Sequence, residues 1–155
     1  MEIQRHGALI DVFDVGVLLL GKSGVGKSES ALELVTRGHR LVADDVVRIR
    51  QAGGKLLGSA PERIRHYIEI RGIGLLYIPE LYGDDSVLPE TSVDLLCRLE
   101  SWREETDYER VGIERPRESL AGVSVPALLL PVRPQHPLAA VREARLVVLV
   151  LPFLL

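Results

Sequence analysis

Eight consecutive residues near the start of the chain restrict its fold more than any other feature. The pattern G-x-x-x-x-G-K-[S/T] is matched in full by Gly21-Lys22-Ser23-Gly24-Val25-Gly26-Lys27-Ser28. Glycines allow backbone angles that a Cβ would hinder, so the loop amides can point inward around phosphate oxygens. The lysine neutralises β- and γ-phosphates, and the hydroxyl after it can bind Mg²⁺. The motif predicts a loop that binds ATP and Mg²⁺; the alternative is a glycine-rich turn that binds nothing.

The residues on both sides of this loop have the patterns that the motif requires. Val17 to Leu20 are apolar without interruption, which predicts a strand buried on both faces. From Ser28 to Arg37 the apolar residues recur at helical spacing, and Gly38 is placed to end that helix. Upstream, the segment from Ala8 to Leu20 predicts two β segments that meet at a tight Asp-Val-Gly turn. A strand, a loop and a helix are therefore expected in this order.

The rest of the chain predicts further short strands with few helices. Apolar runs bounded by Gly, Pro and Asp predict strands at Leu41–Ala43, Val46–Arg50, Lys55–Leu57, Tyr67–Ile70, Ile73–Ile78, Val93–Leu99 and Val125–Val132. Helical turns are expected after Pro61 and from Pro79 to Tyr82, and an exposed loop from Ser101 to Glu118. Many strands, with a helix directly after a buried one, predict an α/β fold with a mixed β-sheet. At 155 residues the chain has the size of one domain, expected to span 1–155.

Composition excludes several classes of function. The net charge is −3 without a long run of one sign, which argues against a nucleic acid partner. The single cysteine, Cys97, cannot form an intramolecular disulfide and fits a reducing, cytoplasmic compartment. The apolar stretch from Leu146 to Leu155 is about half of the ~20 residues that span a bilayer, so no membrane association is expected. The chain contains no asparagine, which excludes the guanine-reading Asn-Lys-x-Asp motif and the catalytic-loop Asn of eukaryotic protein kinases.

Two adjacent acids follow the strand predicted after the first helix. Asp44 and Asp45 come directly after Leu41–Ala43. In a phosphate-binding α/β fold, an acid at the carboxyl end of a strand lies near the nucleotide metal. One carboxylate could hold Mg²⁺ through water, and the other could accept a proton from an attacking hydroxyl. The alternative is a pair of turn residues, because Asp is common in turns.

A second glycine-containing segment carries charges. In Glu69-Ile70-Arg71-Gly72-Ile73-Gly74 the glutamate and arginine are two apart, so a strand would place them on one face. Glu69 could complete a metal site, Arg71 could hold phosphate, and the glycines Gly72 and Gly74 would let the backbone approach a ligand. A salt-bridged, exposed strand is the alternative, since such pairs are common on surfaces.

Three motifs occur in order: the glycine-rich loop followed by Glu29, the segment from Arg37 to Asp45, and the segment from Ile68 to Gly74. Together they resemble the C-terminal catalytic domain of bacterial HPr kinase/phosphorylase, and the resemblance runs from about His6 to Pro134. The resemblance implies that family's fold, related to the phosphoenolpyruvate carboxykinase type, and a hexameric assembly. It also implies ATP-dependent phosphorylation of a serine on HPr, the phosphocarrier of the sugar phosphotransferase system. Reverse phosphorolysis with inorganic phosphate, which yields pyrophosphate, is implied as well.

The resemblance also implies roles for individual residues. Asp45 matches the base for phosphorylation and the proton donor for reversal, while Ser28 and Glu69 match the Mg²⁺ residues. Lys27, His6 and Arg110 match catalytic positions of the family. The last two would not be found from chemistry alone, because an isolated His or Arg is more often a surface residue.

Two departures from the family pattern leave alternatives open. The family usually carries a separate N-terminal domain, whereas this chain starts at the catalytic one, as a natural short form or an excised fragment. After Pro134 the family's Gly-Arg-Asn is replaced by Gln135-His136-Pro137, and residues 135–155 diverge from the family. The resemblance therefore supports kinase activity more strongly than it supports phosphorolysis. A regulatory module that binds ATP without catalysis, and a kinase for a different hydroxyl, are the alternatives.

Overall fold

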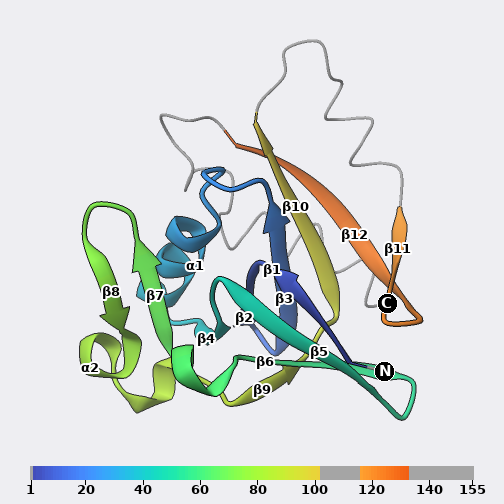
Figure 1. The fold of residues 1–155 in the computed structure, drawn as a ribbon, viewed down its shortest axis with the longest axis horizontal. Helices are drawn as coiled ribbons and strands as arrows, with labels where there is room; N and C mark the ends of the chain where they lie inside the picture. Colours follow the sequence, from blue (N-terminus) through green and yellow to red (C-terminus); the bar gives the residue numbers. More distant parts are fainter. Residues whose placement is uncertain (1, 102–115, 133–155) are drawn as a thin grey trace.

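The computed structural model describes residues 2–101 and 116–132, and its largest element is a six-stranded mixed sheet (Figure 1). The strand order is β11-β12-β10-β3-β2-β4. These strands are β11 (Arg117–Leu120), β12 (Val123–Val132), β10 (Leu95–Ser101), β3 (Val15–Gly21), β2 (Ala8–Val12) and β4 (Arg40–Ala43). β3, β10 and β12 run parallel, while β2 is antiparallel to both β3 and β4. The predicted α/β fold with a mixed sheet is confirmed.

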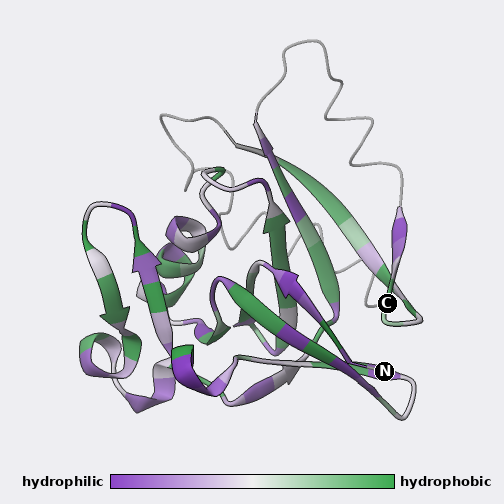
Figure 2. Cartoon of the chain, in the orientation of Figure 1, coloured by the Kyte–Doolittle hydropathy of each residue, from purple (hydrophilic) through white to green (hydrophobic). Residues whose placement is uncertain are grey.

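The central strand β3 is covered on both faces, as its uninterrupted apolar sequence predicts. Val17 and Leu19 pack in a core shared with α1 (Lys27–Thr36), whereas Leu18 and Leu20 pack in a second core on the other face. All four side chains are buried. The green colour of β3 and β10 in Figure 2 marks these apolar strands in the middle of the molecule. Burial on both faces fixes the place where β3 ends and the glycine-rich loop begins.

A four-stranded antiparallel sheet forms the layer on the face opposite α1. Its order is β1-β5-β6-β9, with β1 (Glu2–His6), β5 (Val46–Ala52), β6 (Lys55–Ser59) and β9 (Glu90–Ser92). Val47, Ile49 and Leu56 from this sheet join the second core. Two residues separate the end of β4 from the start of β5, so the turn between the two sheets consists of Asp44 and Asp45.

A two-stranded hairpin packs beside α1. It comprises β7 (Tyr67–Ile70) and β8 (Gly74–Tyr77), preceded by the 3₁₀ turn η1 (Glu62–Ile64) and followed by α2 (Ile78–Tyr82) and η2 (Asp84–Ser86). Ile68 and Ile70 face the core with α1, so alternation places Tyr67 and Glu69 on the outer face. The hairpin therefore carries Glu69 to the amino end of α1.

Several boundaries differ from the sequence prediction. The β2–β3 turn lies at Phe13-Asp14, both with positive φ, rather than at the Asp-Val-Gly triplet. β1 and β9 were not predicted. Arg117 and Glu118, expected at the end of a loop, belong to β11, because they pair with β12. Ser101, the first residue of that predicted loop, belongs to β10, and residues 102–115 lie outside the described residues.

Candidate functional site

The glycine-rich loop connects the end of β3 to the start of α1. Gly24 and Gly26 have φ of 84° and 108°, values that side-chain-bearing residues rarely adopt. At Gly21 a Cβ would lie 2.7 Å from the Leu99 carbonyl oxygen and 2.8 Å from Val25, so only glycine fits there. The helix begins at once, since the Ser30 amide donates to the Gly26 carbonyl at 2.9 Å. The backbone amides that precede Ser30 have no partner within the helix, so they can bind an anion at the positive end of α1.

Lys27 folds back over the loop. Its Nζ donates to the Gly21 carbonyl at 2.7 Å and to the Lys22 carbonyl at 3.1 Å, and the side chain is half-buried. These bonds hold the ammonium at the mouth of the loop, where it can neutralise phosphate oxygens.

The next residue, Ser28, is linked to the acid at the end of β4. Its Oγ lies 2.9 Å and 3.0 Å from the two carboxylate oxygens of Asp44 and donates to that carboxylate. The Glu69 amide donates to the same carboxylate at 3.3 Å. Asp44 is only 3% exposed, and burial raises its pKa from 3.8 to about 6, against the opposing effect of these hydrogen bonds. A cation beside Ser28 would relieve that cost, because it stabilises the ionised carboxylate.

The neighbouring acid has the opposite environment. Asp45 is exposed and has φ of 70°, in the left-handed region that Asp tolerates better than most residues. Its carbonyl accepts from the Gly7 amide at 3.1 Å, and the Val46 amide donates to the Asp44 carbonyl at 2.9 Å. This tight turn directs one carboxylate inward and leaves the other accessible to an incoming hydroxyl.

Glu69 and Arg71 reach the site from the β7–β8 hairpin. Both are exposed, and no ion pair joins them in the part of the chain that the structure describes, which disfavours a salt-bridged strand. Gly72 and Gly74 have φ of 86° and 111°, with no atom within 4 Å of an added Cβ. Within this structure the glycines are required by the hairpin turn rather than by a close approach of backbone.

These groups converge on one hollow of about 350 Å³, which we call the acid-lined hollow. Its charged lining comprises Lys27, Glu29, Asp44, Asp45, Glu69 and Arg71, together with Ser28 and loop glycines. The structure therefore brings together most residues that the sequence singled out. Glu29 also lines this hollow, and among the described residues it is the one charged residue there for which the sequence predicts no role, although it follows the glycine-rich loop in the first of the three motifs.

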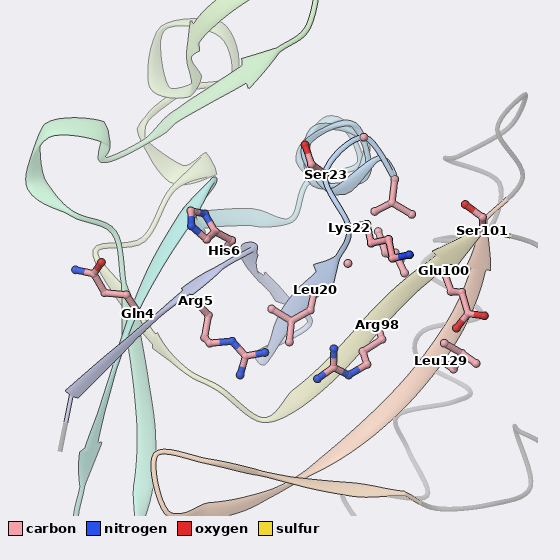
Figure 3. Close-up of a pocket in the computed structure, with 14 residues that line it drawn as sticks. Gln4, Arg5, His6, Leu20, Lys22, Ser23, Arg98, Glu100, Ser101 and Leu129 are labelled. Atoms are coloured by element: carbon pink, nitrogen blue, oxygen red, sulfur yellow. The ribbon is translucent and has the colours of Figure 1, made fainter.

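Of the two remaining catalytic predictions, His6 lies outside this hollow and Arg110 is not among the described residues. His6 ends β1 and lines a larger hollow of about 730 Å³ on the other side of the loop (Figure 3). Its neighbour Gly7 is the residue bonded to the Asp45 carbonyl, so the chain at His6 is anchored beside the acid turn. Arg110 and Gln135-His136-Pro137 lie outside the described residues.

The donor set of the acid-lined hollow fits Mg²⁺. A hydroxyl and carboxylates are hard oxygen ligands, and Mg²⁺ usually takes one or two protein carboxylates, with waters and substrate phosphates completing the octahedron. Within residues 2–101 and 116–132, no group of three or more His, Cys, Asp or Glu is placed to hold a metal ion. Ser28, with Asp44 behind it, and Glu69 would hold the ion.

A buried strand, a glycine-rich loop and a helix, with acids at the end of a nearby strand, are typical of α/β proteins that bind phosphate groups. Residues 1–151 match the family described as HPr Serine kinase C-terminal domain. The chain belongs to this family.

Similar proteins agree with this assignment. The chain is 57% identical over 143 residues to the HPr kinase/phosphorylase of Caldanaerobacter subterraneus subsp. tengcongensis, covering 92% of this chain and 47% of that protein. It is 53% identical over 133 residues to the Leptospira biflexa protein of the same name, covering 84% and 41%. The chain spans about half the length of these curated relatives. The solved Hpr(Ser) kinase/phosphatase from Coxiella burnetii superposes with a TM-score of 0.79 at 34% identity, covering 93% of this chain and 97% of that one.

Within the described residues, no helix has the length and hydropathy to cross a bilayer.

Proposed function

We propose that this chain is a catalytic domain that transfers the γ-phosphoryl group of ATP to a serine hydroxyl of HPr. The observation that carries the proposal is the pair of unlike carboxylates at the loop: Asp44 is buried against Ser28, and Asp45 is exposed beside it. Phosphoryl transfer needs charge neutralisation, positioning of the donor and a group that orients the attacking hydroxyl. Family membership and the names of the relatives supply the acceptor class.

The loop and the start of α1 bind the phosphates of the donor in this proposal. Loop amides surround phosphate oxygens, and Lys27 exchanges its two carbonyl partners for the β- and γ-phosphates. Ser28 and Glu69 would hold Mg²⁺, which when bound would supply positive charge to neutralise the phosphates. Asp44 orients the Ser28 hydroxyl and supplies negative charge behind it.

Asp45 handles the proton. Its exposed carboxylate accepts the proton of the serine hydroxyl while the serine oxygen bonds to the γ-phosphorus and the bond to the β-phosphate oxygen breaks. Arg71 adds positive charge at the same hollow. In the reverse direction inorganic phosphate attacks phosphoserine, pyrophosphate forms, and protonated Asp45 returns its proton to the serine oxygen. His6 and Arg110 are proposed catalytic residues by resemblance.

The broader features of the family extend the proposal. We propose one catalytic domain over 1–155, with the phosphate-binding loop fold related to phosphoenolpyruvate carboxykinase and a hexameric assembly. We also propose a cytoplasmic protein without nucleic acid or membrane partners. Its role would be control of the sugar phosphotransferase system through phosphorylated HPr.

The direct test is transfer of label from [γ-³²P]ATP to purified HPr in the presence of Mg²⁺. Label that appears on HPr, withstands acid as phosphoserine does, and is lost with a serine-to-alanine HPr variant supports the proposal. ATP binding without transfer to HPr or to a panel of other hydroxyl acceptors would instead favour a regulatory module. Transfer to another acceptor alone would favour a different kinase.

A further inference from the structure

The larger hollow has no role in the proposed transfer of the phosphoryl group. We call it the β10 hollow; it is lined by the first half of the glycine-rich loop and by residues from β1, β3, β10 and β12. At about 730 Å³ it is twice the size of the acid-lined hollow and within the range of small-molecule sites. In Figure 3 residues of β1 face those of β10 and β12 across it, with the loop at its edge.

The topology places the β10 hollow where α/β sheets bind nucleotides. β3, β10 and β12 are parallel, so their carboxyl ends lie at the same edge of the sheet. From β3 the chain crosses through α1 toward β4 on one side, while β10 lies on the other side of β3. Ligands of open α/β sheets bind outside the carboxyl ends of strands where the strand order reverses in this way. The β10 hollow is the half of that crevice on the side of the loop away from Asp44 and Asp45.

The direction of a bound polyphosphate follows from the two ends of the loop. Lys27 and Ser28, which serve the β- and γ-phosphates, lie at the acid-lined hollow. The segment from Gly21 to Val25 borders the β10 hollow. With the terminal phosphate toward the acids, the α-phosphate and the group attached to it leave the loop on the β10 side.

The lining of the β10 hollow suits a nucleoside. Leu20, Arg98 and Leu129 are paired neighbours that form one row across β3, β10 and β12, and Leu20 belongs to the core on the face opposite α1. At the rim Glu100 and Ser101 offer oxygen atoms that hydroxyl groups can bond. Along the floor, Arg98 is held by paired hydrogen bonds of 2.7 Å and 2.9 Å to Glu118. A guanidinium fixed in this way presents a flat face on which a base can stack.

We propose that the β10 hollow binds the nucleoside of the phosphoryl donor, with the base lying over the adjacent side chains of Leu129 and Arg98 and the ribose near Glu100 and Ser101. The inference rests on the proposed function, because it assumes that the loop binds a nucleoside triphosphate. It assigns recognition of the base and sugar to β10 and β12.

The test compares Mg·ATP with Mg·tripolyphosphate, which has the phosphates without the nucleoside, by calorimetry on the whole chain. Ser101→Trp fills the rim from an exposed position, and Leu129→Trp fills the hollow itself. Thr36→Trp, exposed at the far end of α1, is the matched control. Thermal melts establish that each variant is folded.

Wild type is expected to bind Mg·ATP at least about tenfold more tightly than Mg·tripolyphosphate. Ser101→Trp and Leu129→Trp should remove that advantage and leave tripolyphosphate binding within about twofold. Equal affinity of wild type for the two probes, or folded variants that keep the advantage, would overturn the nucleoside site while leaving the phosphate loop intact. If wild type bound neither probe, the proposed function would fail, and the nucleoside site with it.

Discussion

The acid-lined hollow and the β10 hollow lie on opposite sides of one loop and differ in the groups they present. The acid-lined hollow, of about 350 Å³, has carboxylates around a hydroxyl, a lysine and an arginine. The β10 hollow, of about 730 Å³, has leucines and arginines from four strands in its lining. The first has the groups for moving a phosphoryl group and a proton, and the second has the space to hold the rest of the donor. The loop can thus separate transfer from recognition, and substitutions on the two sides should have different kinetic signatures.

The largest effect is expected at the exposed acid. Asp45→Asn removes the proposed proton acceptor, so the rate of transfer to HPr should fall by about 10²–10⁴-fold, the usual contribution of general base catalysis. Binding of Mg·ATP should be retained, since the Ser28–Asp44 contact is untouched. Single-turnover transfer and calorimetry measure the two quantities. Asp85→Asn, an exposed acid in η2, is the control; an Asp45→Asn rate equal to that control would refute the role of Asp45.

A smaller effect, on stability, is expected at the buried acid in metal-free protein. The pKa of Asp44, raised by burial to about 6 from 3.8, means that the folded chain binds more protons than the unfolded chain between these pH values. The stability contribution of protonated Asp44 is therefore complete below about pH 4 and is lost as pH rises through about 6. The loss amounts to about 3 kcal/mol at about 1.4 kcal/mol per pH unit.

Asp44→Asn lacks this ionisation, so in EDTA at pH 7.5 it should unfold at higher denaturant than wild type, with the difference vanishing near pH 4. Urea unfolding at several pH values measures the difference in the free energy of unfolding between the variant and wild type. The contributions of other titrating groups cancel in this difference, because both proteins contain them. A variant less stable than wild type at pH 7.5 would show that the ionised carboxylate stabilises the metal-free site. In that case relief of a buried charge could not account for the cation site that we propose beside this carboxylate.

The smallest effect is expected on the β10 side. Arg98 and Glu118 pair at 2.7 Å, but their side chains are 44% and 33% exposed, so solvent screens the pair. Glu118→Gln should lower the free energy of unfolding by less than about 1 kcal/mol and leave the transfer rate at saturating ATP unchanged. Urea unfolding and steady-state assays check both values. A large loss of rate at saturating ATP would mean that the β10 side takes part in transfer, and the contrast between the hollows would be wrong.

The features that depend on neighbouring residues could be predicted from the sequence. The loop, the strand before it and the helix after it follow from a continuous motif and its apolar flanks, and Gly38 follows the helix as expected. The unequal environments of Asp44 and Asp45 could not be predicted. They depend on a positive φ at Asp45 and on the amide of Glu69, which lies 25 residues beyond Asp44 along the chain.

Strand pairing explains the elements that the sequence did not predict. β1 alternates exposed and half-buried residues and has no apolar run, and it exists because it pairs with β5, which lies far along the chain. β9 has only three residues and pairs with β6. The β10 hollow, which includes Arg5 and Arg98, likewise requires strands from distant parts of the chain to meet. Such partners follow from tertiary structure, for which a single sequence carries no local signal.

We propose that Asp44 serves the metal and Asp45 the proton. The most direct test is the Mg²⁺ dependence of transfer to HPr in Asp44→Asn and Asp45→Asn. Loss of a group that orients a metal ligand typically costs about 10–100-fold in metal affinity. Asp44→Asn should therefore raise the Mg²⁺ concentration for half-maximal rate by about that factor. Asp45→Asn should lower the maximal rate and leave that Mg²⁺ concentration unchanged. Equal shifts in both variants, or a shift only in Asp45→Asn, would contradict the assignment of metal to one acid and proton to the other.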